Sequence, residues 1–241
     1  MLLPIEGFPI GKHPLIIRLM KGIFNENPPK PRYIKTWQVS QVLDHLSSLA
    51  DNKDLDLLKL GEKLASLIAI VSAQRVQTLS FLDISHLSLS EDSASFHVMD
   101  LLKTTSIRRS IAQQNVEFKA FASNSKLCVV SALAEYLKKT ESLRQQSGET
   151  RLFISSRKPY KRVTRATIAR WLKNVLVDSG IDVSIFSAHS YRGATTSCAY
   201  NKGVSIEEIM SKASWSNAKI FKDFYFKPVD GCDFADAVLN G

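Results

Sequence analysis

Two arginines of this sequence stand in settings that suit the binding of an anion. Arg75 ends a strongly apolar helical stretch, where burying an unpaired guanidinium is costly, so it must reach either solvent or an anion. Arg192 follows His189 by three positions. In a helix that begins near His189, both side chains share the first turn, where unpaired backbone N–H groups and the helix dipole also attract anions. Taken alone, a surface arginine and a chance pairing of histidine and arginine explain the same residues.

A tyrosine near the C-terminal end could supply a nucleophilic hydroxyl. Phe221 and Phe224 are spaced to anchor one face of a helix that Trp215 precedes, and Tyr225 follows directly. Each residue of an α-helix turns the side chain by about 100°, so Tyr225 is rotated away from the buried direction. Its hydroxyl can then reach a neighbouring site, although an ordinary aromatic at a domain edge fits the same pattern.

A polar loop in the middle of the chain carries Lys103, Arg108 and Arg109. A lysine at a hairpin tip is usually solvated. If the loop folds over a phosphate, Lys103 can instead donate a proton to it. Arg108 and Arg109 are close enough in the loop to take the same place.

The densest basic run of the chain leads into a predicted helix. Charge runs are usually solvated faces. Here the helix start, the interleaved Tyr160 and the net charge of +9 favour contact with the phosphates of a nucleic acid, with binding that weakens steeply with salt. We predict DNA-binding side chains at Arg157, Lys158, Lys161, Arg162, Arg165 and Arg170.

The elements that must position these residues are mostly helical. Apolar spacing and alternation predict a mainly α protein with a small antiparallel β-sheet, an α+β arrangement. Ser40 is a candidate N-cap for a helix that ends at Leu49, and a longer helix is predicted over residues 54–72. One face of the longer helix is predicted to hold Leu57, Leu60, Leu64, Leu67, Ile68 and Val71.

The sheet is predicted from three short alternating runs, and helices follow it. Thr164 and Gly180 mark the start and the end of the first helix of the C-terminal part, in which three or four helices are expected. The predicted elements of this region are strands over 87–90, 95–98 and 115–121, a helix over 130–146 and a brief strand over 152–155.

A proline-rich stretch divides the chain. Residues 13–24 form an amphipathic helix with nothing obvious to pack against, and residues 27–32 cannot continue it because proline lacks the amide donor and displaces the residue before it from the α region. We expect residues 1–30 to be the remnant of a preceding region with its linker, and residues 31–241 to form the main domain.

Composition narrows the class of partner. Lys and Arg number 32 against 23 Asp and Glu, an excess that favours a polyanion. Cys128, Cys198 and Cys232 form no paired motif, so neither a zinc site nor a disulfide framework is indicated. No stretch reaches the roughly 18 apolar residues of a membrane span, and no signal peptide is evident. We therefore expect an intracellular protein, nuclear if the source is eukaryotic.

Together these motifs resemble the tyrosine recombinase (phage integrase) superfamily. Five segments are similar in sequence to the DIRS-type retroelement branch of this superfamily: GKHPLIIRLMKGIFN, QRVQTLSFLDI, LLKTT, SAHSYRGATTS and WSNAKIFKDFY. The resemblance covers nearly the whole chain. One such motif is weak, but five in the order of the family are specific. The positions that match the family's site are Arg75, Lys103, His189, Arg192, Trp215 and Tyr225.

The resemblance implies a role for each matching residue. Arg75 and Arg192 would clamp the nonbridging oxygens of the scissile phosphate, and Tyr225 would attack it to form a 3′-phosphotyrosine link. Lys103 would protonate the leaving 5′-oxygen, and His189 would assist proton transfer at the nucleophile. Trp215 would stand as a hydrogen-bond donor where many members carry histidine. Neither a metal nor another cofactor is implied.

Two positions depart from the commoner pattern of the family. Many members place the tyrosine nine positions after the histidine or tryptophan, whereas Tyr225 stands ten after Trp215, and Phe224 holds the ninth position. The DIRS-type ending in Phe-Tyr favours Tyr225. Many bacterial members also carry an acidic residue three positions after the first arginine, where this chain has Thr78.

The resemblance implies DNA breaking and rejoining in the recombination and integration of a mobile element. Double-stranded DNA would be the partner, with self-association of the chain on it, and the region before residue 31 would be the end of a core-binding domain. The alternatives are a catalytically inactive DNA-binding module derived from such a recombinase and a type IB topoisomerase-like enzyme, which shares the chemistry.

Overall fold

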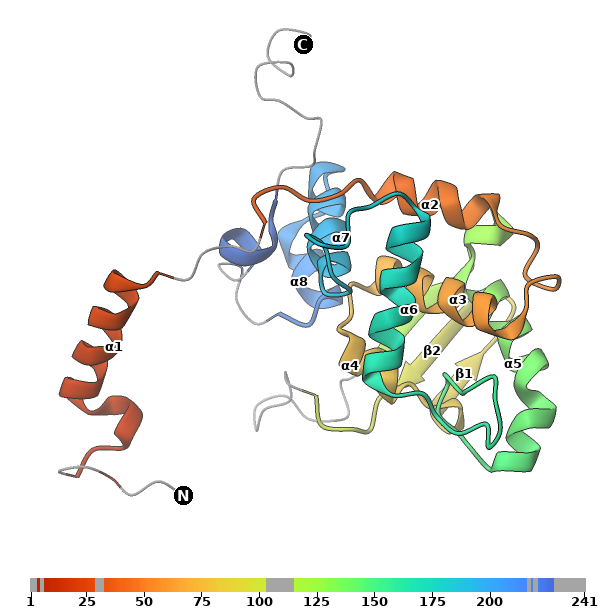
Figure 1. Cartoon of the computed structure of the whole chain (residues 1–241), viewed down its shortest axis with the longest axis horizontal. Helices are drawn as coiled ribbons and strands as arrows, with labels where there is room; N and C mark the ends of the chain where they lie inside the picture. The colour runs from red at the N-terminus through yellow and green to blue at the C-terminus, as the bar shows by residue number, and fades with distance from the viewer. Residues whose placement is uncertain are drawn as a thin grey trace, which may run out of the picture. The chain divides into compact units, whose positions relative to one another are not determined.

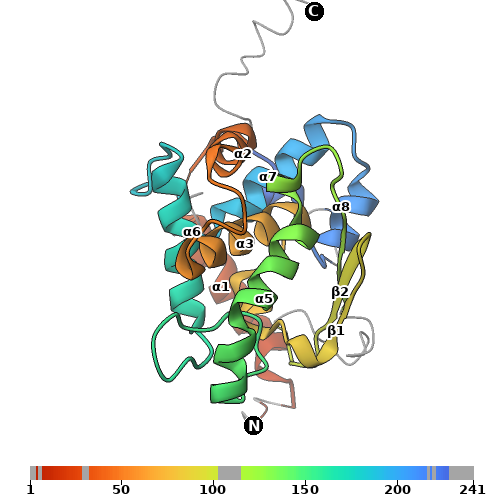
Figure 2. The ribbon, with the colours of Figure 1, turned by 90° about the vertical axis from the view of Figure 1, so that its right-hand side faces the viewer.

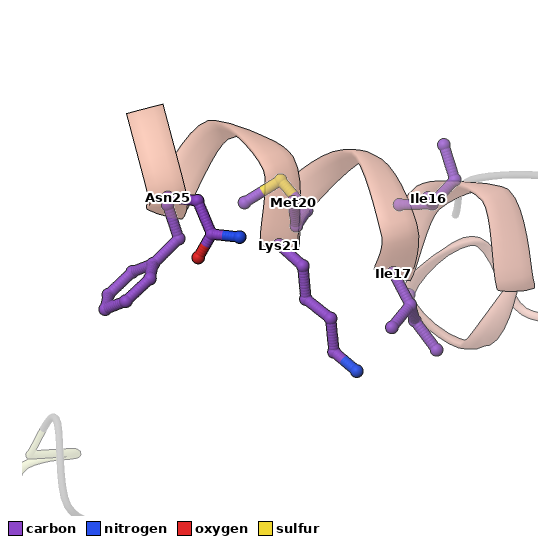
Figure 3. Close-up of a pocket in the computed structure, with 7 residues that line it drawn as sticks. Ile16, Ile17, Met20, Lys21 and Asn25 are labelled. Atoms are coloured by element: carbon purple, nitrogen blue, oxygen red, sulfur yellow. The ribbon is translucent and has the colours of Figure 1, made fainter. Parts of the chain in front are cut away.

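The computed structural model describes residues 4, 7–28, 33–102, 115–215, 218 and 221–227. The chain divides into two compact units, Met1–Arg32 and Tyr33–Gly241. The first unit holds a 3-10 turn, Ile10–Lys12, and helix α1, Pro14–Glu26, which begins with proline at its first position. No residue of α1 is buried, and Figure 3 shows the apolar hollow along one of its sides. This helix matches the amphipathic segment predicted over residues 13–24.

The second unit is mainly helical (Figure 1). Its three short strands form one antiparallel sheet in the order β1-β2-β3, as predicted. The principal elements are α2 Val39–Ser48, α3 Leu57–Ser72, α4 Val76–Phe81, β1 Leu87–Leu89, β2 Ser93–His97, β3 Asn115–Lys119, α5 Val129–Ser147, α6 Arg165–Asp178, α7 Ser190–Asn201, α8 Ile206–Lys212 and a π-helical turn, Phe221–Tyr225.

Helix α3 lies in the middle of this unit, with α5, α6 and α7 packed around it (Figure 2). Gly61 allows the close approach, because a Cβ there would lie 3.3 Å from the Trp171 ring of α6 and 3.4 Å from the Tyr136 ring of α5. Since helices surround it, α3 is buried on nearly all sides. The predicted apolar face was therefore too narrow, and it was wrong at Val71, which is 49% exposed near the end of the helix.

Several helix ends agree with the sequence and one does not. The Thr164 hydroxyl accepts the N–H of Thr167 at the start of α6, and Gly180 follows this helix with a φ of 76°. Ser40 is not an N-cap: α2 begins at Val39 after Gln38, and the Ser40 hydroxyl instead donates to the Gln38 side chain at 3.5 Å. The helix starts earlier because Val39 is itself a buried core residue.

The segment predicted as a strand over residues 152–155 pairs its backbone with residues 161–163, but it forms only an isolated bridge there, between Ile154 and Arg162. The Ser155 N–H donates to the Lys161 carbonyl, and the Phe153 carbonyl accepts the Val163 N–H. The Arg144 guanidinium of α5 donates to the carbonyls of Glu149, Arg151 and Leu152, which satisfies backbone acceptors that a sheet would otherwise pair. Within the described ranges, no helix is long and apolar enough to cross a membrane.

Candidate functional site

The N-terminal turn of α7 is fixed from two sides. The Trp37 indole N–H donates to the Ser190 hydroxyl at 2.8 Å, and the Tyr191 hydroxyl donates to the Leu172 carbonyl of α6 at 3.1 Å. His189 is the N-cap residue, as the sequence predicted within one position. These bonds hold rigidly the turn from which His189 and Arg192 project.

Arg192 is almost completely buried, with 1% of its surface exposed. One terminal nitrogen, Nη1, donates to the Ala73 carbonyl at 2.8 Å, and the other, Nη2, donates to the Ala213 carbonyl. The guanidinium carbon lies 4.5 Å from the centre of the Trp215 ring, a cation–π contact. Its Nε is buried and has no hydrogen-bond partner among the described residues. The group is thus held in place by both terminal nitrogens, and its Nε–H donor is unused.

The two carbonyls that hold Arg192 belong to unusual backbone turns. Ala73 closes α3 with a φ of 50°, and Ser214, which follows Ala213 directly, has a φ of 53°. Residues other than glycine rarely adopt this left-handed conformation, and such outliers cluster at functional sites. Tyr160 is the only other described non-glycine residue with a positive φ. The local strain is concentrated where the backbone meets Arg192.

Arg75 lies beside Arg192 at the start of α4. Arg75 is half-buried and is the N-cap residue of α4. Burial and the nearby positive charge of Arg75 lower the pKa of Arg192 to about 10, and the Tyr225 hydroxyl partly opposes this shift. No carboxylate pairs with either arginine among the residues that the structure describes. Two adjacent guanidinium groups without a counter-ion form a site for an anion.

Gln74 ties the turn that carries Arg75 to the end of α8. Its side-chain amide donates to the Lys212 carbonyl at 2.8 Å, and its oxygen accepts the Thr78 hydroxyl at 3.3 Å. Thr78 therefore supports this turn through Gln74, at the position where many members of the resembled family carry an acid. This role of Gln74 could not be predicted from the sequence, because a glutamine next to an arginine is a common pair.

Tyr225 faces the same group of residues. Its hydroxyl lies 3.2 Å from Nε2 of His189, within hydrogen-bond distance. Its ring centre lies 4.5 Å from that of Trp215 and 5.5 Å from the guanidinium carbon of Arg192. The structure thus brings together Arg75, His189, Arg192, Trp215 and Tyr225, which come from three separate stretches of sequence.

The turn that carries Tyr225 is π-helical. The N–H of Phe226 donates to the Phe221 carbonyl at 2.7 Å, an i→i+5 bond that places one more residue in the turn than an α-helix does. Phe221 is buried beside Trp215, as predicted for an anchor of this segment.

Small residues of α7 accept the backbone of this segment. The Ser197 hydroxyl donates to the Tyr225 carbonyl at 3.1 Å and accepts the Lys227 N–H at 3.0 Å. One turn earlier, a Cβ on Gly193 would lie 3.5 Å from the same carbonyl. Ser197 was not singled out from the sequence, where it is one of several small polar residues in a row.

The predicted DNA-binding residues make none of the contacts described above. Lys103, Arg108 and Arg109 are outside the described residues. The side chain of Lys161 donates to the Ser147 carbonyl at 2.7 Å, and the backbone N–H of Arg162 donates to the Glu149 carboxylate at 3.0 Å. All the predicted DNA-binding side chains are exposed: Arg157, Lys158, Lys161, Arg162, Arg165 and Arg170.

The fold is that of tyrosine recombinase catalytic domains. The XerH site-specific recombinase in a pre-cleavage complex with its difH substrate has a TM-score of 0.58 at 11% identity, over 98% of this chain and 66% of the recombinase. The XerA recombinase also has a TM-score of 0.58, at 19% identity, over 90% of this chain and 71% of its own. At these identities the likeness is one of fold. No protein-family model matches the chain, and no curated protein matches its sequence.

Proposed function

We propose that this chain is the catalytic domain of a tyrosine recombinase, which cuts and rejoins double-stranded DNA through a 3′-phosphotyrosine link. The observation that carries the proposal is the convergence of the Tyr225 hydroxyl with two guanidinium groups that no described carboxylate neutralises. A scissile phosphate is an anion, and a phenol is a nucleophile suited to attack it.

The chemistry follows from these positions. The Tyr225 oxygen attacks the phosphorus, the bond from phosphorus to the 5′-oxygen breaks, and the 3′-phosphate remains on the tyrosine. Neutral His189, whose Nε2 lies 3.2 Å from the hydroxyl, accepts the phenol proton, and the leaving 5′-oxygen takes a proton from a general acid. Lys103 is our proposed acid. The covalent link conserves the energy of the phosphodiester, so rejoining is the reverse reaction and needs no nucleotide.

Arg75 and Arg192 would stabilise the charge that develops on the phosphate. Arg192 has a free Nε donor and is held rigidly by two carbonyls, so it need not reorganise during the reaction. Trp215 supports it from one face of the guanidinium plane. These contacts make Arg192 a preorganised donor, whereas half-buried Arg75 is the more accessible of the two.

The broader context of the reaction is also proposed. The exposed basic run that includes Arg157 and Arg165 would contact DNA phosphates, and copies of the chain would associate on DNA. The sequence similarity to DIRS-type elements supports recombination or integration of a mobile element, in the nucleus of a eukaryotic host. Residues 1–30 would be the end of a core-binding domain, whose exposed α1 face fits a helix that packs elsewhere.

A suicide DNA substrate tests the proposal. A nick close to the cleavage site lets the short product diffuse away and traps the covalent intermediate, which a denaturing gel resolves. Because the target sequence is not defined, a library of nicked duplexes is the substrate. We expect an adduct with the wild-type chain and none with Tyr225→Phe. DNA binding without any adduct in the wild type would instead favour the inactive DNA-binding module.

A further inference from the structure

Ser197 makes two hydrogen bonds that join the Tyr225 segment to α7 on either side of Phe226, whose ring also packs against Tyr200 of the same helix. The serine is completely buried, and its single hydroxyl serves both neighbours of that residue. It donates to the carbonyl of Tyr225 at 3.1 Å and accepts the N–H of Lys227 at 3.0 Å. A hydroxyl can donate one proton and still accept, so both bonds coexist.

These bonds act on the backbone of the residue that carries the phenol. The π-helical turn ends at Tyr225, and the Phe226 N–H closes it. The tyrosine carbonyl is therefore at the free end of a short turn, where a shift of the backbone moves the ring. Ser197 fixes that end to α7, the same helix whose first turn holds His189 and Arg192.

The precision of this attachment matters for an attack on phosphorus. Displacement of a reacting group by about 1 Å can cost on the order of 100-fold in rate. The Trp215 ring contacts the phenol ring at a centre-to-centre distance of 4.5 Å and an interplanar angle of 37°, a contact that acts on the side chain and not on the backbone. The hydrogen bonds of Ser197 hold the backbone itself.

We propose that Ser197 is a positioning residue that aligns the Tyr225 nucleophile with His189 and Arg192. The inference rests on the proposed recombinase function. Ser197 does not touch the phosphate, so its loss should slow cleavage and leave DNA affinity unchanged. It should also expose the Lys227 amide, which can be measured without any DNA.

The test compares Ser197→Ala with Thr195→Ala. Among the described residues, the Thr195 hydroxyl bonds only to the Tyr191 carbonyl of its own helix, at 2.5 Å. Thr195→Ala therefore removes a hydroxyl from α7 without removing a contact to the tyrosine segment. We expect Ser197→Ala to cleave roughly 10-fold to 100-fold more slowly in a single turnover, with a DNA Kd within about twofold of the wild type. Thr195→Ala should match the wild type in both measurements.

Hydrogen exchange and a second variant keep the outcomes separate. The Lys227 amide should exchange slowly in the wild type and rapidly in Ser197→Ala. If Ser197→Ala does not fold, Lys227→Pro removes the same N–H from the other side, and Lys227→Ala, which keeps the N–H, is its reference. An adduct formed at the wild-type rate by Ser197→Ala, or by Lys227→Pro relative to Lys227→Ala, overturns the role of Ser197. Absence of an adduct in the wild type is the distinct result that rejects the recombinase function.

Discussion

At the scale of single residues, Arg192 shows how the backbone prepares a side chain for an anion. Its planar fork reaches the carbonyls of Ala73 and Ala213 together, while its face covers Trp215. A lysine has one charged nitrogen and cannot make this set of contacts. The left-handed turns at Ala73 and Ser214 give those carbonyls their places, so part of the site is built from backbone conformation.

Arg192→Lys should therefore lose both catalysis and stability. We expect the single-turnover rate of adduct formation to fall by roughly 100-fold to 1000-fold, the usual effect of removing one preorganised donor. The melting temperature should fall as well, because the Ala73 and Ala213 carbonyls lose donors. Arg75→Lys is the matched comparison: it should slow cleavage but keep the melting temperature, since no hydrogen bond of the Arg75 side chain is present among the described residues. Equal melting temperatures for the two variants would contradict the anchoring of Arg192.

The residues proposed to carry the chemistry could be selected from the sequence, and the groups that hold them could not. Arg75, His189, Arg192, Trp215 and Tyr225 stand out by residue type and order, and the structure brings all five together. The carbonyls that anchor Arg192 have no signature, because every residue has a carbonyl. The hydroxyl clamp on the tyrosine segment was hidden for a similar reason, since its serine lies among other small polar residues.

At the scale of elements, a π-helical turn carries the tyrosine whose hydroxyl lies next to His189. Tyr225, the tenth residue after Trp215, ends this turn, and its hydroxyl lies 3.2 Å from Nε2 of His189. A turn of this kind is costly in an ordinary helix and is often found at functional sites. Its i→i+5 bond, from the Phe226 N–H to the Phe221 carbonyl, is the feature that sequence periodicity of 3.6 residues cannot predict.

Moving the tyrosine by one position tests this arrangement. The double variant Phe224→Tyr, Tyr225→Phe keeps composition and places a phenol at the spacing common in the family. We expect no covalent adduct, because the π-helical turn directs residue 225 toward His189. Circular dichroism should show an unchanged helical content. An adduct formed by the double variant at the wild-type rate would show that the turn does not select the nucleophile.

Helix α3 carries a buried charge that should make stability depend on pH. Lys63 is completely buried, its Nζ has no hydrogen-bond partner among the described residues, and burial with the nearby Lys126 lowers its pKa from 10.5 to about 8, against the opposing charge of Asp51. Between these pH values the unfolded chain binds more protons than the folded one. Stability should therefore rise as pH increases from about 8 to 10.5.

Lys63→Met should remove this dependence. At pH 7 the variant is expected to be more stable than the wild type by on the order of 3 kcal/mol, since each pKa unit corresponds to about 1.4 kcal/mol. Urea unfolding at pH 7, 8.5 and 10 measures the difference, which should shrink as pH rises. Lys138→Met, at an exposed position of α5, is the control and should follow the wild type. A constant difference between wild type and Lys63→Met would refute the buried charge.

Sequence patterns located most elements but misjudged those set by tertiary contacts. The three strands and the Thr164 cap depend on local chemistry and were predicted. Val71 and the start of α2 depend on what surrounds each helix, which no local pattern contains. Residues 152–155 resemble a strand in composition, yet their pairing with residues 161–163 amounts to an isolated bridge, and the Leu152 carbonyl bonds to Arg144 instead of to a strand.

At the scale of the whole molecule, the proposed nucleophile and the proposed phosphate-binding groups lie together within one chain. Tyr225 lies 3.2 Å from His189 of the same α7 helix that clamps its backbone. Copies of the chain that associate on DNA would then each cut with their own tyrosine. All the residues of this arrangement belong to the second compact unit, Tyr33–Gly241.

Mixing two inactive variants tests attack within one chain. Tyr225→Phe lacks the nucleophile and Arg192→Lys lacks the phosphate clamp. If each active site uses its own tyrosine, the mixture should form no more adduct than either variant alone. Adducts at a quarter or more of the wild-type level would show that tyrosines are exchanged between chains.

The most direct measurement locates the covalent bond itself. The wild-type chain is trapped on a nicked duplex, digested with protease and nuclease, and analysed by tandem mass spectrometry. A nucleotide joined through its 3′-phosphate to the Tyr225 oxygen, and formed much more slowly when either Arg75 or Arg192 is replaced by lysine, is the result expected if the three groups meet at one phosphorus. A nucleotide on any other residue, or DNA that is bound and never joined to protein, would contradict this account.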